Sequence, residues 1–241
     1  NGAPIPWSCV TLDVHDVDRP EDVVFAGRWL AAHRVPATFL VPGQLLRQAG
    51  LRDALATMPA LGHELGSHGL RHDWNEADAL STGRPLGFLA EARDLHEAAF
   101  GVRPVSFRAP YWVRLAPAAA AELARLGYEV DSSATPQRLP LLSSRPFARG
   151  WLFAARRPRP IAPGLLEIPT STLLVPAGGA TFPLLRGLSR AFLGALAAEA
   201  RWTGARVLVV QLHAGDLNPD APAAARTTPD RGVRRRFSTA R

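Results

Sequence analysis

Two histidines four residues apart give this sequence its clearest chemical signal. They are His68 and His72, within the segment GHELGSHGLRH at residues 62–72. This spacing places both imidazoles on one face of a helical turn, where they could bind one metal ion. An ion of intermediate softness such as Zn²⁺ accepts imidazole together with carboxylate. Taken alone, the pair is also compatible with two surface histidines.

An acidic residue ends the first apolar segment of the chain. Asp13 follows the β-branched and apolar residues 7–12, in the sequence TLDVHD. A carboxylate at that place is costly unless it is paired or bound to a metal, so Asp13 could be a general base. His15 or Asp16 could then complete a metal site. The alternative is that Asp13 caps a loop at the end of a strand.

Three more ionisable residues follow predicted strands. Arg108 could pair with a carboxylate and lower its pKa. His213 ends the strongly apolar segment 207–213 and could act as a general acid. Asp131 could orient an imidazole. A structural role is the alternative for each: an ion pair, a hydrogen-bonded histidine or a cap.

The positions of these residues depend on alternating strands and helices. Short apolar segments predict strands at residues 7–13, 37–41, 62–67, 104–107, 128–131, 165–168 and 207–213. Longer amphipathic segments predict helices at residues 21–34, 45–58, 88–100, 116–126 and 183–202. This alternation predicts an α/β fold, with a parallel sheet or barrel covered by helices. In such folds the active site lies at the carboxyl ends of the strands, so the residues named above should converge there.

The composition excludes several classes of protein. The chain has 241 residues, of which 47% are hydrophobic, so it can form a packed core and is not disordered over most of its length. Its single cysteine excludes a disulfide framework within the chain. No run of apolar residues is long enough to predict a transmembrane segment, and no signal peptide is visible.

Basic residues dominate the second part of the chain. The net charge is +7, and the arginines gather at residues 145–159 and 226–241. Such a region could contact nucleic acid, an anionic polymer or lipid, or remain a solvated surface. No zinc-finger spacing or RNP-like aromatic motif accompanies it, so we expect no nucleic-acid partner.

Taken in order, the motifs resemble those of the polysaccharide deacetylase family, which carries the NodB homology domain and includes carbohydrate esterase family 4. GHELGSHGLRH resembles the family's His-Ser/Thr-x-x-His metal motif, and FRAPYW resembles its Arg-x-Pro-Tyr motif. YEVDSS resembles the motif that begins with Asp, and LHAGD resembles the Leu-x-His motif. LEIPTS is similar to the segment before the last barrel strands. The matches span residues 7–216.

The resemblance implies a distorted (β/α) barrel of the NodB type, in a single domain over residues 1–241. It implies a metal-dependent hydrolase of linear amide bonds that removes an acetyl or other N-acyl group from an amino sugar. The substrate would be a polysaccharide, an oligosaccharide or a glycoconjugate, in the cell envelope or outside the cell. Barrels of this family close with a helix, and residues 228–241 look like its beginning, so we expect a truncated C-terminal end.

The resemblance also implies a role for each site residue. His68 and His72 would bind the metal, most often Zn²⁺. Asp13 would be the base, held by an ion pair with Arg108. The backbone N–H of Tyr111 would stabilise the oxyanion. His213 would protonate the leaving amine, and Asp131 would orient His213.

The first motif departs from the family pattern at one position. The common motif has two adjacent acidic residues, of which the second is the third metal ligand, and here Val14 stands there. His15 lies on the same side of the strand as Asp13 if the strand continues, which would give a three-histidine site. Asp16 would restore the usual pair of histidines with a carboxylate if the chain turns. We favour His15.

This departure also leaves other functions open. The Asp-x-His pattern looks like a branch of the family with Asp-x-Asp or Asp-x-Glu, which includes deformylases of lipid-linked amino sugars. The alternative substrate is therefore a lipid-linked or other small amide. If neither candidate reaches the metal, the chain would be an inactive carbohydrate-binding homologue. No Trp follows the YEVDSS motif, so Trp74 or Trp112 could form an aromatic wall of the site instead.

Overall fold

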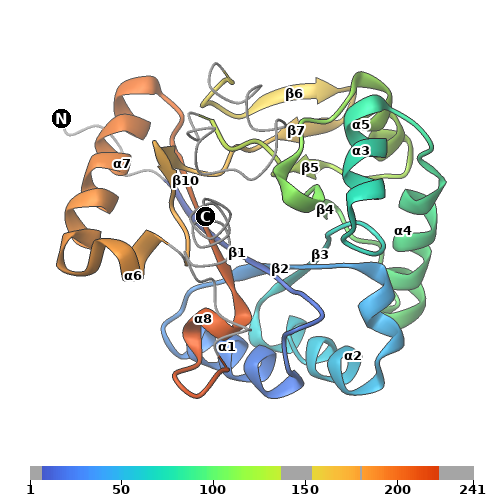
Figure 1. Ribbon diagram of the computed structural model, residues 1–241, viewed down its shortest axis with the longest axis horizontal. Helices are drawn as coiled ribbons and strands as arrows, with labels where there is room; N and C mark the ends of the chain where they lie inside the picture. The colour runs from blue at the N-terminus through green and yellow to red at the C-terminus, as the bar shows by residue number, and fades with distance from the viewer. Residues whose placement is uncertain (1–6, 137–153, 180, 223–241) are drawn as a thin grey trace, which may run out of the picture.

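A curled eight-stranded sheet forms the centre of the protein (Figure 1). The computed structural model describes residues 7–136, 154–179 and 181–222. The strands are β1 Trp7–Asp13, β2 Ala37–Val41, β3 Glu64–Ser67, β4 Ser106–Phe107, β5 Val130–Asp131, β6 Arg159–Ala162, β7 Leu165–Glu167 and β10 Val207–His213. Their order is β10-β1-β2-β3-β4-β5-β7-β6, and all neighbours are parallel except β6 and β7.

Strand β1 lies between β10 and β2, and its register brings the polar strand ends to one edge. Asp13 of β1 is level with His213 of β10 and with Leu40 of β2. The carboxyl ends of parallel strands lie at the same edge of a sheet. The loops that follow β1, β3, β4 and β10 therefore open together at this edge.

Helices cover the outside of the sheet (Figure 1). Their bounds are α1 Pro20–Ala32, α2 Ala49–Ala56, α3 Trp74–Thr82, α4 Gly87–Phe100, α5 Pro117–Arg125, α6 Thr181–Leu185, α7 Ser189–Thr203 and α8 Ala214–Leu217. Helices α1 and α8 pack against each other, and α7 lies beside β10. No helix in the described part of the chain is long and apolar enough to span a membrane.

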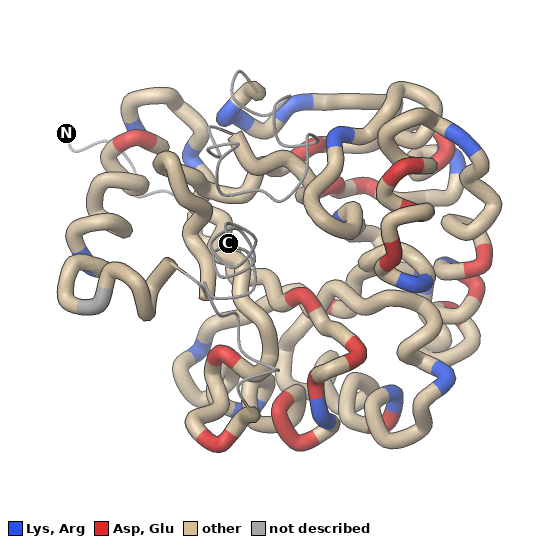
Figure 2. Tube along the Cα trace, viewed as in Figure 1, with Lys and Arg blue, Asp and Glu red and all other residues tan. Residues whose placement is uncertain are grey.

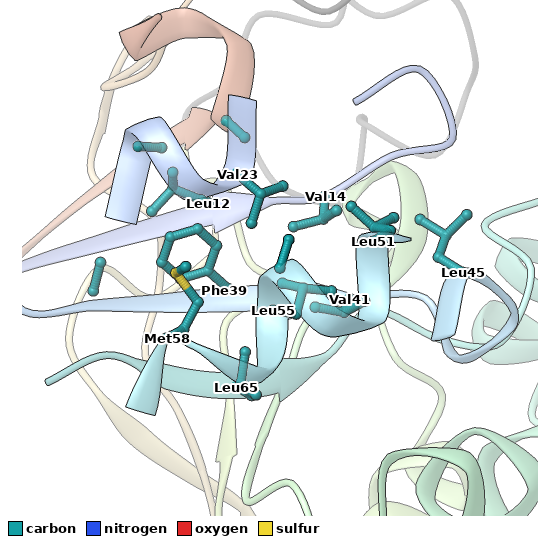
Figure 3. Packing of buried hydrophobic residues seen from close by; sticks show 14 of the residues in the cluster. Leu12, Val14, Val23, Phe39, Val41, Leu45, Leu51, Leu55, Met58 and Leu65 are labelled. Atoms are coloured by element: carbon teal, nitrogen blue, oxygen red, sulfur yellow. The ribbon is translucent and has the colours of Figure 1, made fainter. Parts of the chain in front are cut away.

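The main apolar core lies between strands β1 and β2 and helices α1 and α2 (Figure 3). Leu12, Val23 and Phe39 are completely buried in it. Val14 also lies in this core and is completely buried. Because its backbone N–H donates to the carbonyl of Leu40, the extended chain of β1 continues past Asp13.

An irregular segment between β7 and β10 completes the barrel wall. It contains the short antiparallel strands β8 (Thr172–Leu173) and β9 (Val175–Pro176). Ser171 donates its backbone N–H to Val209 of β10, and Gly178 forms a parallel bridge with Gln211. A Cβ at Gly178 would lie 2.8 Å from the carbonyl oxygen of Gln211, so glycine allows this close approach.

The strands predicted at residues 7–13, 37–41 and 207–213 are confirmed with the same bounds. The helical segment predicted at residues 45–58, with an interruption expected at Gly50, is interrupted at Gln48 instead. A 3-10 helix at Gly43–Arg47 and helix α2 replace it, because Gln48 between them adopts an extended conformation.

One other helix prediction needs correction, and one helix was missed. The helix predicted at residues 183–202 is divided into α6, a 3-10 turn at Arg186–Leu188 and α7. Helix α3 was not predicted. Asp73 caps its first turn by accepting the backbone N–H of Glu76, and Asp-x-x-Glu is the local signal that could have predicted it.

Acidic residues gather around α1 and α8, whereas arginines lie at the start of β6 and in the segment just before it (Figure 2). Most of the basic segment 145–159, all of the basic segment 226–241 and the helix expected at residues 228–241 lie outside the described residues. A single domain over residues 1–241 stays a prediction.

Candidate metal and catalytic site

Three histidine side chains meet at the carboxyl edge of the sheet. His15 follows β1, His68 follows β3, and His72 lies in the loop before α3. Their ligand nitrogens all lie within 4.8 Å of one another. Within the described part of the chain, Nε2 of His15 is buried and has no hydrogen-bond partner. A metal ion would satisfy such a nitrogen, since imidazole is a common ligand of divalent metals.

His68 has the orientation that a metal ligand requires. Its Nδ1 lies 2.8 Å from the carbonyl oxygen of Arg108, so Nδ1 carries the proton and Nε2 keeps its lone pair. Burial lowers the pKa of His68 to about 3. Burial, together with the neighbouring histidines, holds the pKa of His15 well below its usual value. Both rings are therefore neutral at pH 7, as metal binding demands.

The segment between His68 and His72 is a loop, so the prediction of a helical turn is wrong. Gly69 and His72 have φ angles of 80° and 58°, which a right-handed turn excludes. Glu76 of α3 stabilises the loop by accepting the backbone N–H groups of residues 70–72. A Cβ on Gly69 would lie 2.7 Å from Oε2 of Glu76. The loop therefore needs glycine at this position.

The structure places the two candidates for the third ligand differently. His15 belongs to the histidine group, and its ring centroid lies 4.5 Å from that of His72. Asp16 is exposed and does not belong to that group. The reason is the continued extended chain of β1, in which alternate residues face opposite sides. Val14 faces the core (Figure 3). The next residue, His15, therefore lies on the same side as Asp13.

A buried ion pair fixes Asp13. Arg108 Nη1 donates to Oδ1 of Asp13 at 2.7 Å, and both side chains are almost fully buried. Gln211 Nε2 donates to Oδ2 at 3.1 Å. Burial by itself would raise the pKa of Asp13, but Arg108 and the nearby histidines outweigh burial and hold the pKa below its usual range. Asp13 is therefore ionised at neutral pH.

His213 lies next to His15, with ring centroids 4.5 Å apart. The predicted contact between Asp131 and His213 is not formed. One carboxylate oxygen of Asp131 accepts from Ser133 Oγ, and the other has no partner in the described part of the chain. In the sheet, Asp131 is level with Phe107 of β4 and with Glu167 of β7. Burial, with the charge of Glu167 adding to it, raises the pKa of Asp131 to about 7.

Aromatic side chains border the histidine group. Tyr111 has a φ of 57°, and its hydroxyl donates to the carbonyl of His72 at 3.1 Å. Its ring stacks on Trp74, with centroids 3.7 Å apart and planes inclined by 7°. The ring centroid of Tyr111 also lies 4.8 Å from that of His72. Tyr111 and Trp74 therefore form an aromatic surface next to the candidate metal ligands.

Several polar residues that support the site were not predicted from the sequence. Gln211 stands in the middle of an apolar strand, and that interruption was the available signal. Thr11 stands similarly in β1, and its hydroxyl accepts from Arg108. Asp18 lies in a segment without a strong pattern, and the Asp-x-x-Glu signal at Glu76 indicates only the start of a helix, so the contacts of both residues with the site depend on tertiary structure.

Half of the chain resembles a known protein family. The sequence model described as polysaccharide deacetylase matches residues 10–130, which is half of the chain. The chain belongs to the polysaccharide deacetylase family. The matched segment contains Asp13, the three grouped histidines and Arg108, whereas His213 lies beyond it. The search of curated proteins gave no match.

A solved structure described as a deacetylase shares the fold. A Mycobacterium smegmatis protein described as a polysaccharide deacetylase superposes with a TM-score of 0.60 and 20% identity, over 93% of this chain and 84% of that chain. The chitin deacetylase of the fungal pathogen Colletotrichum lindemuthianum gives a TM-score of 0.47 and 17% identity, over 93% and 92%. The first superposition, together with the curled sheet, confirms the expected distorted barrel of this deacetylase family.

Proposed function

We propose that this polysaccharide deacetylase family member is a metal-dependent hydrolase that removes an N-acyl group, most often acetyl, from an amino sugar. The substrate would be a polysaccharide, an oligosaccharide or a glycoconjugate. The observation that carries the proposal is the group of three histidines beside an ionised aspartate. Family membership supports hydrolysis of an amide bond in a carbohydrate.

His15, His68 and His72 would hold the metal ion. Their rings lie close together, Nε2 of His15 has no hydrogen-bond partner among the described residues, and His68 is locked by the Arg108 carbonyl. Three imidazoles with an open position are typical of catalytic Zn²⁺, which is the ion we propose. When bound, such an ion polarises the amide carbonyl and lowers the pKa of a coordinated water.

Asp13 would accept the proton of the attacking water. Arg108 and Gln211 bind its two carboxylate oxygens and so fix its orientation. The ion pair lowers the basicity of Asp13, but it also keeps the residue in the charged form that can accept a proton. Preorganisation of this kind costs no rearrangement during the reaction.

The leaving amine and the oxyanion require separate donors. His213, next to His15, would donate a proton to the amine. The backbone N–H of Tyr111 would donate to the developing oxyanion. The stacked rings of Trp74 and Tyr111 would provide an apolar wall for the face of a sugar ring. These roles rest on the family motifs and on the placement of the side chains.

The test of this function is the metal content of the chain, measured beside three variants. We expect about one equivalent of Zn²⁺ in the unmodified chain and in Asp16→Ala, and loss of the metal in His68→Ala and His15→Ala. Release of acetate or formate from N-acetylated and N-formylated amino sugars should follow the metal content. Formate release alone would assign the deformylase substrate.

Absence of metal even after addition of Zn²⁺ would overturn the proposal. The chain would then be tested for carbohydrate binding without turnover. Stoichiometric metal in His68→Ala would instead show that the ion lies at another site.

A further inference from the structure

Three of the four site histidines share a contact of the main chain. Each donates its backbone N–H to a carboxylate three or four residues further along. The distances are 2.7, 3.2 and 2.8 Å for His15–Asp18, His72–Glu76 and His213–Asp216. The same hydrogen bond, from a histidine N–H to a nearby carboxylate, therefore occurs on three loops that are far apart in sequence.

The fourth histidine shows why the other three need this contact. The backbone N–H of His68 donates to the carbonyl of Val41, so the ladder between β3 and β2 fixes it directly. His15 and His72 lie beyond the ends of regular strands. A backbone N–H at such a position needs another acceptor, and a carboxylate oxygen supplies it in each of these loops.

Asp18 binds one of the loops and lies close to a second. It is 7% exposed, and one of its oxygens accepts the N–H of His15. Its other oxygen is buried without a hydrogen-bond partner among the described residues, and the backbone N–H of Gly215, two residues after His213, lowers the pKa of this carboxyl group. A second link runs from Asn218 Nδ2 to Asp22 Oδ1 at 2.6 Å. The contact between α1 and α8 therefore sets His15 and His213 relative to each other.

We propose that Asp18, Glu76 and Asp216 are positioning residues, each of which places one site histidine through its main chain. The proposal rests on the proposed function of the site. Asp18 would support metal binding through His15, and Glu76 would support it through His72. Asp216 would support proton donation through His213. Residues outside the ligand set that orient metal ligands contribute about 10- to 100-fold to affinity.

The experiment compares alanine variants of these carboxylates in the full chain. Asp18→Ala and Glu76→Ala should weaken Zn²⁺ binding about 10- to 100-fold in a chelator competition and change the Co²⁺ absorption spectrum. Asp216→Ala should leave the Zn²⁺ affinity unchanged and lower kcat rather than raise KM. Asp18→Asn keeps an acceptor oxygen and should restore most of the Zn²⁺ affinity.

The control is a carboxylate at the opposite end of β3. Glu64 accepts hydrogen bonds from Thr38 Oγ1 and Ser106 Oγ. Glu64→Ala should lower the melting temperature without changing Zn²⁺ affinity or the Co²⁺ spectrum. A purely structural role of the three carboxylates predicts the Glu64→Ala behaviour for them as well, and that result would overturn the proposal.

A measurement without metal separates this proposal from the proposed function. In the metal-free chain, Asp18→Ala should shift the imidazole resonances of His15 and leave those of His96, which lies on α4, unchanged. Failure of the unmodified chain to bind metal would overturn the proposed function, and the resonances would still test the positioning role. Unshifted resonances of His15 in Asp18→Ala would overturn the positioning role of Asp18.

Discussion

At Asp13, burial and charge act on the carboxyl group in opposite directions. Burial favours the neutral acid, but the guanidinium of Arg108 and the neighbouring histidines favour the carboxylate and prevail. The ion pair is almost fully buried, so removing one partner would leave an uncompensated charge inside the barrel. Asp13 is thus bound to its partners before any substrate arrives.

The first prediction concerns removal of the negative charge of Asp13. Asp13→Asn keeps the shape of the side chain but cannot accept a proton, so kcat should fall by at least about 100-fold. Bound Zn²⁺ should remain near one equivalent, because Asp13 does not belong to the histidine group. Turnover and metal content of the same preparation provide the measurement. Turnover near that of the unmodified chain would remove Asp13 from the role of base.

Val14 allows a test of the departure from the family pattern. Val14→Asp restores the adjacent acidic pair, but it places a carboxylate in the apolar core. We expect a loss of several kcal/mol in the free energy of unfolding, on the order of the cost of burying a charge, and no gain in Zn²⁺ affinity. Val14→Ala, which removes only apolar contacts, is the control. Tighter Zn²⁺ binding in Val14→Asp would contradict the placement of this side chain.

At the scale of elements, the parallel strands bring the site residues to one edge of the sheet. The loops between strands and helices then set the orientation of their side chains. β1, β3 and β10 bring His15, His68 and His213 to one edge, because their carboxyl ends are level. The wall is completed by the segment between β7 and β10, which approaches Gln211 through Gly178. Since Gln211 also binds Asp13, this segment supports the site from outside.

Two glycines should respond oppositely to the same substitution. Gly178→Ala places a Cβ 2.8 Å from the backbone oxygen of Gln211, so it should lower the free energy of unfolding by about 1–3 kcal/mol. Gly194 lies in α7 with open space around it, and Gly194→Ala should raise stability by about 0.5–1 kcal/mol. Urea denaturation of both variants measures this. Equal effects would show that Gly178 does not approach β10 closely.

At the scale of the whole molecule, two buried carboxyl groups make the free energy of unfolding depend on pH in opposite directions. The pKa of Asp13 is lowered on folding, so its contribution is present above the unfolded pKa of 3.8 and is lost as the pH falls further. The pKa of Asp131 is raised from 3.8 to about 7. Between these values the folded chain binds a proton at Asp131 that the unfolded chain does not. Stability from this residue therefore falls as the pH rises from 4 to 7.

Asp131→Asn should remove this pH dependence. Relative to the variant, the unmodified chain should lose up to about 1.4 kcal/mol per pH unit in this range, since one proton is involved. The measurement is the free energy of unfolding from urea titrations of the metal-free chain at several pH values between 4 and 7. Ser133 contacts the same carboxyl group, so Ser133→Ala is a useful companion that leaves Asp131 titratable. Parallel curves for the unmodified chain and Asp131→Asn would contradict the raised pKa.

The sequence by itself determined the α/β alternation, several strand bounds and the positions of the polar strand ends. The strands at residues 7–13 and 207–213 could be predicted because apolar and β-branched side chains specify a buried strand locally. The motifs also identified the family and most of the candidate site. Period-2 alternation along β1 favoured His15 over Asp16, although it required that the strand continue past Asp13.

Only the tertiary structure decided which of these residues meet. It showed that β1 does continue, that residues 68–72 form a loop, and that Asp131 contacts Ser133 rather than His213. It also revealed Asp18 and Glu76 as acceptors of histidine N–H groups. These contacts depend on the curl of the sheet and on backbone angles in short loops. Neighbours in the sequence do not specify such features, because the packing of distant elements selects them.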